Sequence, residues 1–303
     1  MNILAPIVVF TYNRPEHTLR TFNALLENPL ANESDIIIYS DSAKTANHNK
    51  SVDEVRSLLS EITGFRSKKV IHRDKNFGLA ESIIQGVTEV LQESEKVIVL
   101  EDDMVVSPYF LEYMNEALEQ FVEDDRVISV HGYVYPVDFE LPEAFFVKGA
   151  DCWGWATWRR GWEIFEPNGQ FLLDELMRRH LIQEFDYNGA YPYSNMLSAQ
   201  IKGANDSWAI RWHASAFLAD KLTLYPGRSL VHNSGNDGSG THCRNSDRME
   251  VKLSKTKINL DNIAVESSRI GREAFEIFFK RSQKSLLHQF FGKIKVFVQE
   301  KIR

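Results

Sequence analysis

Three consecutive acidic residues, Glu101, Asp102 and Asp103, follow the short apolar segment 97–100. Carboxylates at the end of a buried strand are costly unless an opposite charge compensates them. A divalent cation bridging to a phosphate provides that charge, and carboxylate oxygens suit Mg²⁺ or Mn²⁺. On an extended backbone, residues 101 and 103 point to one side and residue 102 to the other. We therefore expect the triplet to divide between a metal and sugar hydroxyls; the alternative is a solvated helix cap before Pro108.

The acidic triplet is one of four polar loops that follow predicted strands. Apolar runs predict strands over residues 7–10, 36–39, 69–72 and 97–100, and helical spacing predicts helices over 15–26, 52–62 and 79–91. Such strands joined by helices indicate an α/β fold, with a mainly parallel sheet covered on both faces. Ligands of these sheets bind beyond the carboxyl ends of the strands. The polar residues expected there are Thr11, Asn13, Arg14, Asp41, Arg73, Asn76, Gly78, Glu101, Asp102 and Asp103.

The second half of the chain has a different character. All six tryptophans lie between residues 153 and 212, and a glycine-rich loop, which we expect to act as a lid, follows at 234–240. Most large aromatic side chains belong to a core. Trp153 and Trp155, which flank Gly154, are the candidates for stacking on sugar rings.

Several segments, in order, resemble GT-A fold glycosyltransferases. Residues 97–110 look like the metal-binding segment of that fold, closest to the N-acetylglucosaminyltransferase I type, and the whole is similar to bacterial family-two-like sugar transferases. The resemblance covers roughly residues 5–245. Its other segments are 8–15 and 76–80 for the nucleotide, 154–158 with Trp162, Glu166 and Pro167 for an acceptor-side helix, 206–211 for the catalytic base and 225–240 for a flexible loop.

The resemblance implies a Rossmann-like GT-A sheet and a role for each matching residue. Asp103 would bind Mn²⁺ or Mg²⁺, with His242 as an extra ligand, and Asp206 would act as the base of an inverting transfer. Because Ser207 replaces the second acid of the family's paired acids, Asp151 and Asp237 stay open as alternative bases. The implied donor-binding residues are Thr11, Asn13, Arg14, Asp41, Arg73, Asn76, Gly78, Glu101 and Asp102, and the acceptor-binding residues are Trp153 and Trp155.

Composition and charge exclude several classes of protein. The 303 residues are 43% hydrophobic and 25% charged, which is ordinary globular composition. A net charge of −7 argues against a nucleic-acid binder that relies on overall positive charge. The two cysteines are too few for a disulfide framework, and no run is long enough to span a bilayer. The sequence start also lacks signal-peptide features, so we expect a cytoplasmic protein.

The C-terminal tail is the exception to the acidic balance. Residues 280–303 hold seven Lys or Arg and one Glu, with apolar residues at steps of three and four. This pattern predicts a basic amphipathic helix, either peripheral on the anionic inner face of the plasma membrane or docked on its own domain. We expect a nucleotide-sugar-binding half over 1–135, an acceptor-binding and catalytic half over 136–265, and this tail over 266–303.

The predicted function is a metal-dependent inverting glycosyl transfer. The donor is a nucleotide sugar, with a UDP-sugar favoured, and the acceptor is a glycan hydroxyl, for example on a lipid-linked intermediate of surface polysaccharide biosynthesis. One alternative is a nucleotidyltransferase that makes sugar nucleotides, although residues 10–15 contain no glycine. The other alternative is a non-catalytic carbohydrate-binding protein that uses the tryptophans.

Overall fold

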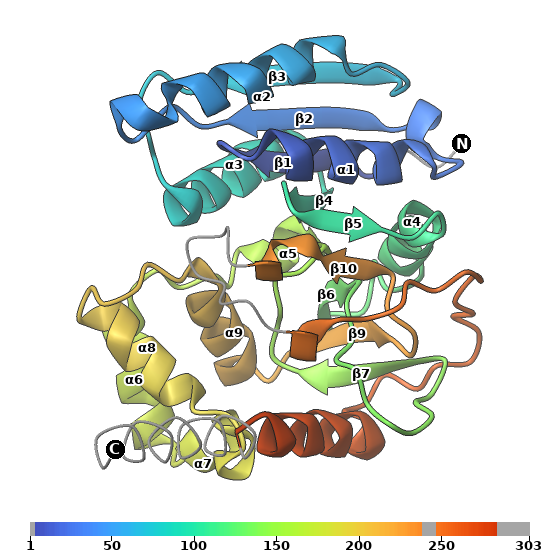
Figure 1. The fold of residues 1–303 in the computed structure, drawn as a ribbon. Helices are drawn as coiled ribbons and strands as arrows, with labels where there is room; N and C mark the ends of the chain where they lie inside the picture. Colours follow the sequence, from blue (N-terminus) through green and yellow to red (C-terminus); the bar gives the residue numbers. More distant parts are fainter. Residues whose placement is uncertain (1–3, 238–246, 284–303) are drawn as a thin grey trace, which may run out of the picture.

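The computed structural model describes residues 4–237 and 247–283. Its strands are β1 (Ile7–Thr11), β2 (Asp35–Ser40), β3 (Ser67–His72), β4 (Lys96–Glu101), β5 (Met104–Val106), β6 (Val127–His131), β7 (Ala144–Lys148), β8 (Trp155–Trp158), β9 (Leu222–Pro226) and β10 (Val231–Asn233). Its helices are α1 (Pro15–Leu26), α2 (Asn49–Glu61), α3 (Leu79–Glu93), α4 (Phe110–Gln120), α5 (Arg159–Trp162), α6 (Gly169–Arg178), α7 (Ile182–Phe185), α8 (Tyr193–Ile201) and α9 (Trp208–Leu218). Within the described residues, eight strands form one sheet in the order β3-β2-β1-β4-β8-β6-β9-β7, and β10 pairs with β5 (Figure 1).

The first half of the chain forms the parallel part of this sheet. Strands β3, β2, β1 and β4 run parallel, and β1 is buried along its whole length because helices cover both faces. Helix α1 begins at Pro15, whose fixed φ angle suits a first helical turn. The predicted α/β fold with a mainly parallel sheet is therefore confirmed, and each predicted strand and helix of this half is present.

The second half adds strands of both directions. Strand β8 is antiparallel to β4 and β6, β9 is parallel to β6, and β7 is antiparallel to β9. The expectation of an acceptor-side helix from residue 154 to Pro167 is wrong over residues 155–158, which form β8, and the helix α5 begins only at Arg159. The four residues of β8 are buried and Trp155 pairs with Val99 and His131, so the segment completes the middle of the sheet.

Helices cover the two faces with different partners. On one face, α1, α2 and α4 pack on the sheet through apolar residues such as Phe22, Leu59 and Phe110. On the other face, α3 and α9 enclose a tryptophan-rich core that includes Trp155, Trp208 and Trp212. Helices α6, α7 and α8 pack beside α9 in a satellite cluster (Figure 1).

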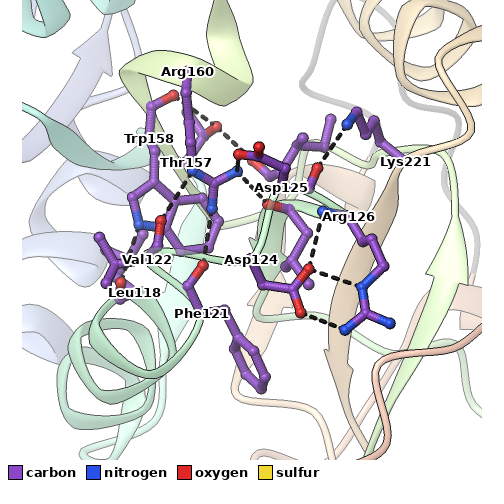
Figure 2. A network of polar contacts seen from close by, with 12 residues as sticks. Leu118, Phe121, Val122, Asp124, Asp125, Arg126, Thr157, Trp158, Arg160 and Lys221 are labelled. Atoms are coloured by element: carbon purple, nitrogen blue, oxygen red, sulfur yellow. Dashed lines mark hydrogen bonds and ion pairs between the residues drawn. The ribbon is translucent and has the colours of Figure 1, made fainter.

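Arg160 fastens α4 to the edge of the sheet where β6 begins. Its guanidinium donates to three backbone carbonyl oxygens, those of Val122 at 3.1 Å, Val127 at 2.8 Å and Phe121 at 2.8 Å (Figure 2). It also stacks on the ring of Trp158 at 4.6 Å from the ring centroid. The network lies where β6 starts, and β6 is parallel to β4, so the end of β4 is left free at the opposite edge.

A further helix covers residues 269–283 and packs on the second half through Phe275 and Phe279. The predicted amphipathic segment lies largely in residues 284–303, outside the described part of the chain, as does His242. Among the residues that the structure describes, no helix is both long and apolar enough to cross a bilayer.

Candidate active site

The carboxyl ends of the four parallel strands place most of the predicted polar loops at one edge. Strands β2, β1 and β4 are direct neighbours, so Asp41 after β2, Arg14 after β1 and Glu101 at the end of β4 lie at adjacent strand ends. After β3, the loop with Arg73, Asn76 and Gly78 lies at the same edge, because β3 pairs in parallel with β2. This is the edge at which ligands of such sheets bind.

The acidic triplet is held together by Arg14. Its Nη2 atom donates to Asp102 Oδ1 at 2.5 Å and to Asp103 Oδ2 at 2.7 Å. The backbone N–H of Tyr12 donates to Asp102 Oδ2 at 3.2 Å. Residues 102 and 103 form a turn between β4 and β5. The predicted alternation of the three carboxylates is therefore wrong, since a turn brings Asp102 and Asp103 to the same guanidinium.

The electrostatics of the triplet follow from burial and crowding. Burial, and then the charges of Asp103 and Asp102, raises the pKa of Glu101 to about 8. Burial also raises the pKa of Asp102, with Arg14 opposing the shift. Burial lowers the pKa of Arg14, but the charges of Asp102 and Asp103 outweigh it and the net shift is upward. The guanidinium of Arg14 is thus a permanent positive charge between the carboxylates of Asp102 and Asp103, and the carboxyl of Glu101 favours its neutral form.

Two polar atoms of this cluster are buried without a hydrogen-bond partner in the described structure, Asp103 Oδ1 and Arg14 Nη1. One is an acceptor and the other a donor, and both belong to side chains already tied together by Arg14 Nη2. Buried polar atoms in folded proteins are usually satisfied. A ligand that offers both a cation and an anionic oxygen satisfies both atoms at once.

The turn after β10 closes on the same cluster. The N–H and Oγ of Ser234 donate to the Asp103 carbonyl oxygen at 2.8 and 3.0 Å. The α-carbon of Gly235 packs so closely that an added Cβ would lie 2.1 Å from Asp103 Oδ2 and 2.9 Å from Arg14 Nη1. The sequence indicated a glycine-rich loop here, but its contact with the acidic triplet needed the fold. Gly235 is therefore a site residue that sequence analysis missed.

Asp41 organises the neighbouring loop. Its carboxylate accepts hydrogen bonds from Asn76 Nδ2 at 3.0 Å, from the N–H of Phe77 at 3.0 Å and from the N–H of Gly78 at 2.9 Å. The N–H of Ser42 donates to the same carboxylate at 2.8 Å. The structure thus brings Asp41, Asn76 and Gly78 together, with Asp41 as the residue that fixes the loop.

Arg73 lies between two aromatic rings, with its guanidinium carbon 4.9 Å from the Tyr39 centroid and 4.7 Å from the Phe77 centroid. Its Nη2 lies 3.7 Å from Glu89, and its buried Nε and Nη2 have no hydrogen-bond partner in the described structure. Thr11 is also buried, and its hydroxyl donates to the carbonyl oxygen of Tyr39. Asn13 is half-buried in the loop after β1.

Tyr12 is a second residue that sequence analysis did not select. Its hydroxyl lies 2.7 Å from His48 Nδ1 and accepts a hydrogen bond from the N–H of Lys44 at 3.0 Å. These contacts fasten the loop after β1 to the loop after β2. Its position between Thr11 and Asn13 was the only signal in the sequence.

Asp206 lies two residues before the start of α9. Strand β9, which follows α9, begins beside the start of β6, so α9 runs away from the edge that carries the acidic triplet. Its beginning, with Asp206 and the capping residue Ser207, therefore lies on the side of that edge. Burial lowers the pKa of Arg211, and the charges of Asp206 and Glu81 oppose the shift. Glu81 belongs to the first turn of α3, which likewise begins at this edge.

The structure separates the two tryptophans expected at the acceptor. Trp155 is 1% exposed and packs among Trp162, Trp208 and Trp212. It has no free face for a sugar, so its assignment to the acceptor is wrong. Trp153 is half-buried and packs on Tyr133 with ring centroids 4.8 Å apart.

No group of three or more His, Cys, Asp or Glu side chains in the described residues could by itself hold a metal ion. Mg²⁺, however, usually binds proteins through one or two carboxylates and completes its shell with water and substrate phosphates. Asp103, with one free and buried carboxylate oxygen, fits that mode.

The family model described as "Glycosyl transferase family 2" matches residues 7–163, which is more than half of the chain. No curated protein matches this chain. Among solved structures, it is similar to the mannosyltransferase PcManGT from Pyrobaculum calidifontis in complex with GDP-Man and Mn²⁺, at 12% identity over 44% of this chain and 36% of that one, with a TM-score of 0.31.

It is also similar to S. aureus TarS, at 16% identity over 48% of this chain and 24% of that one, with a TM-score of 0.31. For TarS residues 1–349, the identity is 12% over 77% of this chain and 61% of that one, with a TM-score of 0.39. The chain thus spans less than two thirds of the length of each of these proteins.

Proposed function

Because the chain belongs to glycosyl transferase family 2 and has the GT-A fold, we propose that it transfers a sugar from a nucleotide-sugar donor to a hydroxyl of a glycan acceptor. The observation that carries the proposal is the pair of buried, unsatisfied atoms Asp103 Oδ1 and Arg14 Nη1. A divalent cation on the carboxylate and a phosphate oxygen on the guanidinium satisfy both. A metal–diphosphate is one ligand that offers the two groups together.

The metal would be held by Asp103, with Asp102 keeping Arg14 in place. When bound, Mn²⁺ or Mg²⁺ neutralises the negative charge that develops on the diphosphate leaving group. Arg14 adds a fixed positive charge at the same place, since its guanidinium is anchored to both carboxylates. Glu101, the last residue of β4, is assigned to the ribose of the donor or to the water shell of the metal.

We assign the groups of the donor other than the diphosphate to the loops at the carboxyl ends of the parallel strands, within residues 1–135. Asp41 holds the loop of Asn76 and Gly78 against the nucleotide, and the unsatisfied nitrogens of Arg73 are available to the base. Thr11 and Asn13 complete the loop after β1. We favour uridine as the base, as the sequence resemblance implies.

Asp206 is our assignment for the general base. A base must come within hydrogen-bond reach of the attacking hydroxyl, and the beginning of α9 lies on the side of the donor edge. One base and an in-line displacement invert the configuration of the anomeric carbon. Asp206→Asn removes the proton acceptor while keeping the shape of the side chain.

The acceptor is assigned to the half formed by residues 136–265, with Trp153 as one contact. We propose a lipid-linked acceptor at the inner membrane surface. The outward side of the helix over 269–283 supports this, since Ile270 and Ile277 are 50% and 38% exposed and Lys280 is exposed beside them. This exposed face also carries Glu273, so it is the two isoleucines, more than the charge, that suit contact with a membrane surface.

The test is thermal unfolding of the intact protein with nucleoside diphosphates and nucleotide sugars, with and without Mn²⁺. A ligand at one hundred times its Kd adds about 2.7 kcal/mol to native stability. We expect a metal-dependent rise in Tm with one nucleotide, and its loss in Asp103→Asn. The variant Asp174→Asn, on the exposed side of α6, serves as the matched control. A wild-type Tm that no nucleotide moves would refute the donor site.

A further inference from the structure

The charge of one carboxylate, that of Asp151, acts on six of the ten tyrosines of the chain, and one of the six, Tyr135, contacts it directly. They come from the segment after β6, the stretch before and at the start of α8, and the end of β9. Burial raises the pKa of each of them, and the charge of Asp151 adds to the rise. The six are Tyr133, Tyr135, Tyr187, Tyr191, Tyr193 and Tyr225.

Asp151 itself has few partners. The hydroxyl of Tyr135 donates to Oδ2 at 3.2 Å, and the N–H of Cys152 donates to Oδ1 at 2.9 Å. In the part of the chain that the structure describes, no Lys, Arg or His forms an ion pair with it. The nearby Arg272 is engaged elsewhere, since it donates to the Glu184 carbonyl oxygen at 2.7 Å and covers the ring of Tyr187 at 4.7 Å. Among the described residues Asp151 therefore has no ion-pair partner, although its charge also acts on His131 and His213, whose pKa values burial lowers.

Part of this cluster is open to solvent. Asp151, Trp153, Tyr191 and Tyr193 are half-buried, whereas Tyr133 is only 1% exposed and lies beneath Trp153. The rings of Tyr191 and Tyr193 are 4.5 Å apart. Aromatic rings beside an unpaired carboxylate form the kind of site that binds an organic ammonium group, through cation–π attraction and an ion pair.

The loop that carries Asp151 is rigidly held beside the donor edge. His213 Nδ1 lies 2.8 Å from the Ala150 carbonyl oxygen, and the N–H of Trp153 donates to His131 Nε2 at 2.9 Å. Gly154 follows in a left-handed conformation, where an added Cβ would lie 3.3 Å from a methyl carbon of Leu100. Leu100 precedes Glu101, so the loop approaches the end of β4 from the acceptor half.

We propose that Asp151, together with the half-exposed rings of Trp153, Tyr191 and Tyr193, binds an ammonium group on the acceptor. The acceptor class is then a sugar with a free amino group. This inference rests on the proposed function, because it assigns the cluster to the acceptor of the same reaction. A neutral sugar would leave the carboxylate of Asp151 without an ion-pair partner.

The experiment measures sugar binding to the intact protein with Mn²⁺ and UDP present, by ligand-observed NMR titration at pH 6.5. The probes are D-glucosamine, D-glucose and N-acetyl-D-glucosamine. We expect D-glucosamine to bind at least tenfold more tightly than the two neutral sugars. Asp151→Asn should abolish this preference without changing the UDP-dependent rise in Tm, whereas Asp261→Asn, on an exposed loop, should keep it.

Because Asp151 lies in a packed loop, Tyr191→Leu provides a second variant that leaves the carboxylate in place. It should weaken D-glucosamine binding severalfold through loss of one ring. Equal binding of the charged and neutral sugars by the wild type, or an unchanged preference in Asp151→Asn, would overturn the inference while the donor site stands. If UDP does not raise the Tm, that result counts against the proposed function instead. In that case the preference for D-glucosamine over the neutral sugars can still be measured by NMR without UDP.

Discussion

Gly235→Ala tests the acidic site without changing any charge. The backbone of Gly235 is not in the left-handed region, so alanine is permitted there and the effect reports on contact alone. The new Cβ would lie 2.1 Å from Asp103 Oδ2. Since nonbonded heavy atoms prefer separations of at least about 3.5 Å, the carboxylate and the Ser234–Gly235 turn must separate by about 1.4 Å. That movement disrupts the 2.7 Å hydrogen bond between Arg14 and Asp103.

We expect two measurable consequences. Overpacking costs about 1–3 kcal/mol of stability, or a fall in Tm of about 2 °C for each kcal/mol in a chain of this size. A tenfold weaker affinity for nucleotide plus Mn²⁺ would also halve the ligand-induced stabilisation, from about 2.7 to about 1.4 kcal/mol at the same ligand concentration.

Thermal unfolding with and without UDP and Mn²⁺ measures both quantities in one assay. Gly203→Ala is the control, because Gly203 has a φ of 69° and no atom within 4 Å of an added Cβ. It loses about 1 kcal/mol through backbone strain alone and should keep the full ligand-induced rise. A Gly235→Ala protein with unchanged stability and an unchanged ligand response would refute the contact between this turn and Asp103 as part of the proposed metal–diphosphate site.

Three more predictions concern separate parts of the molecule. Burial and the neighbouring carboxylates raise the pKa of Glu101 in the folded protein to about 8, from its ordinary value of 4.5. Between these pH values the folded protein therefore holds a proton there that the unfolded chain releases. The stability that this group contributes is present at low pH and is lost as the pH rises from about 4.5 through about 8. Urea unfolding across that range should show a free energy of unfolding that varies less with pH in Glu101→Gln than in the wild type. The same pH dependence in both proteins would contradict the raised pKa. Arg160→Ala removes three hydrogen bonds to carbonyl oxygens and a ring contact. We therefore expect urea unfolding to show a free energy of unfolding lower by about 3 kcal/mol. Nucleotide affinity, measured by titration of the native protein, should not change. Asp206→Asn should lower kcat at least a hundredfold while nucleotide binding stays intact, and a kcat near that of the wild type would move the base to another acid.

The parallel half of the fold was predictable because its physics is local. Buried parallel strands show continuous β-branched runs, and the helices between them show apolar residues at three- and four-residue steps. Residues 7–10 and 97–100 carry these patterns clearly, and the rule that ligands bind at the carboxyl ends then selects Arg14 and Asp103. Little tertiary information was needed for that step.

The second half was less predictable because its strands are short and its aromatic residues serve two purposes. Residues 155–158 contain two tryptophans in four positions and show no strand alternation, yet they pair with β4 and β6 in the middle of the sheet. From sequence, Trp153 and Trp155 were equivalent flanks of Gly154. In the fold, the left-handed turn at Gly154 leaves Trp153 at the surface and sends Trp155 into the core.

The contacts that define the site depend on residues far apart in the chain, which explains why composition and spacing did not reveal them. Gly235 reaches Asp103 only because β10 pairs with β5, the strand that follows the acidic turn. Asp151 meets its tyrosines only because β6, β9 and α8 converge on one loop. In the function proposed above, the first contact lies at the donor and the second at the acceptor, so we expect substrate specificity to depend on these pairings between distant segments more than on the motif at residues 101–103.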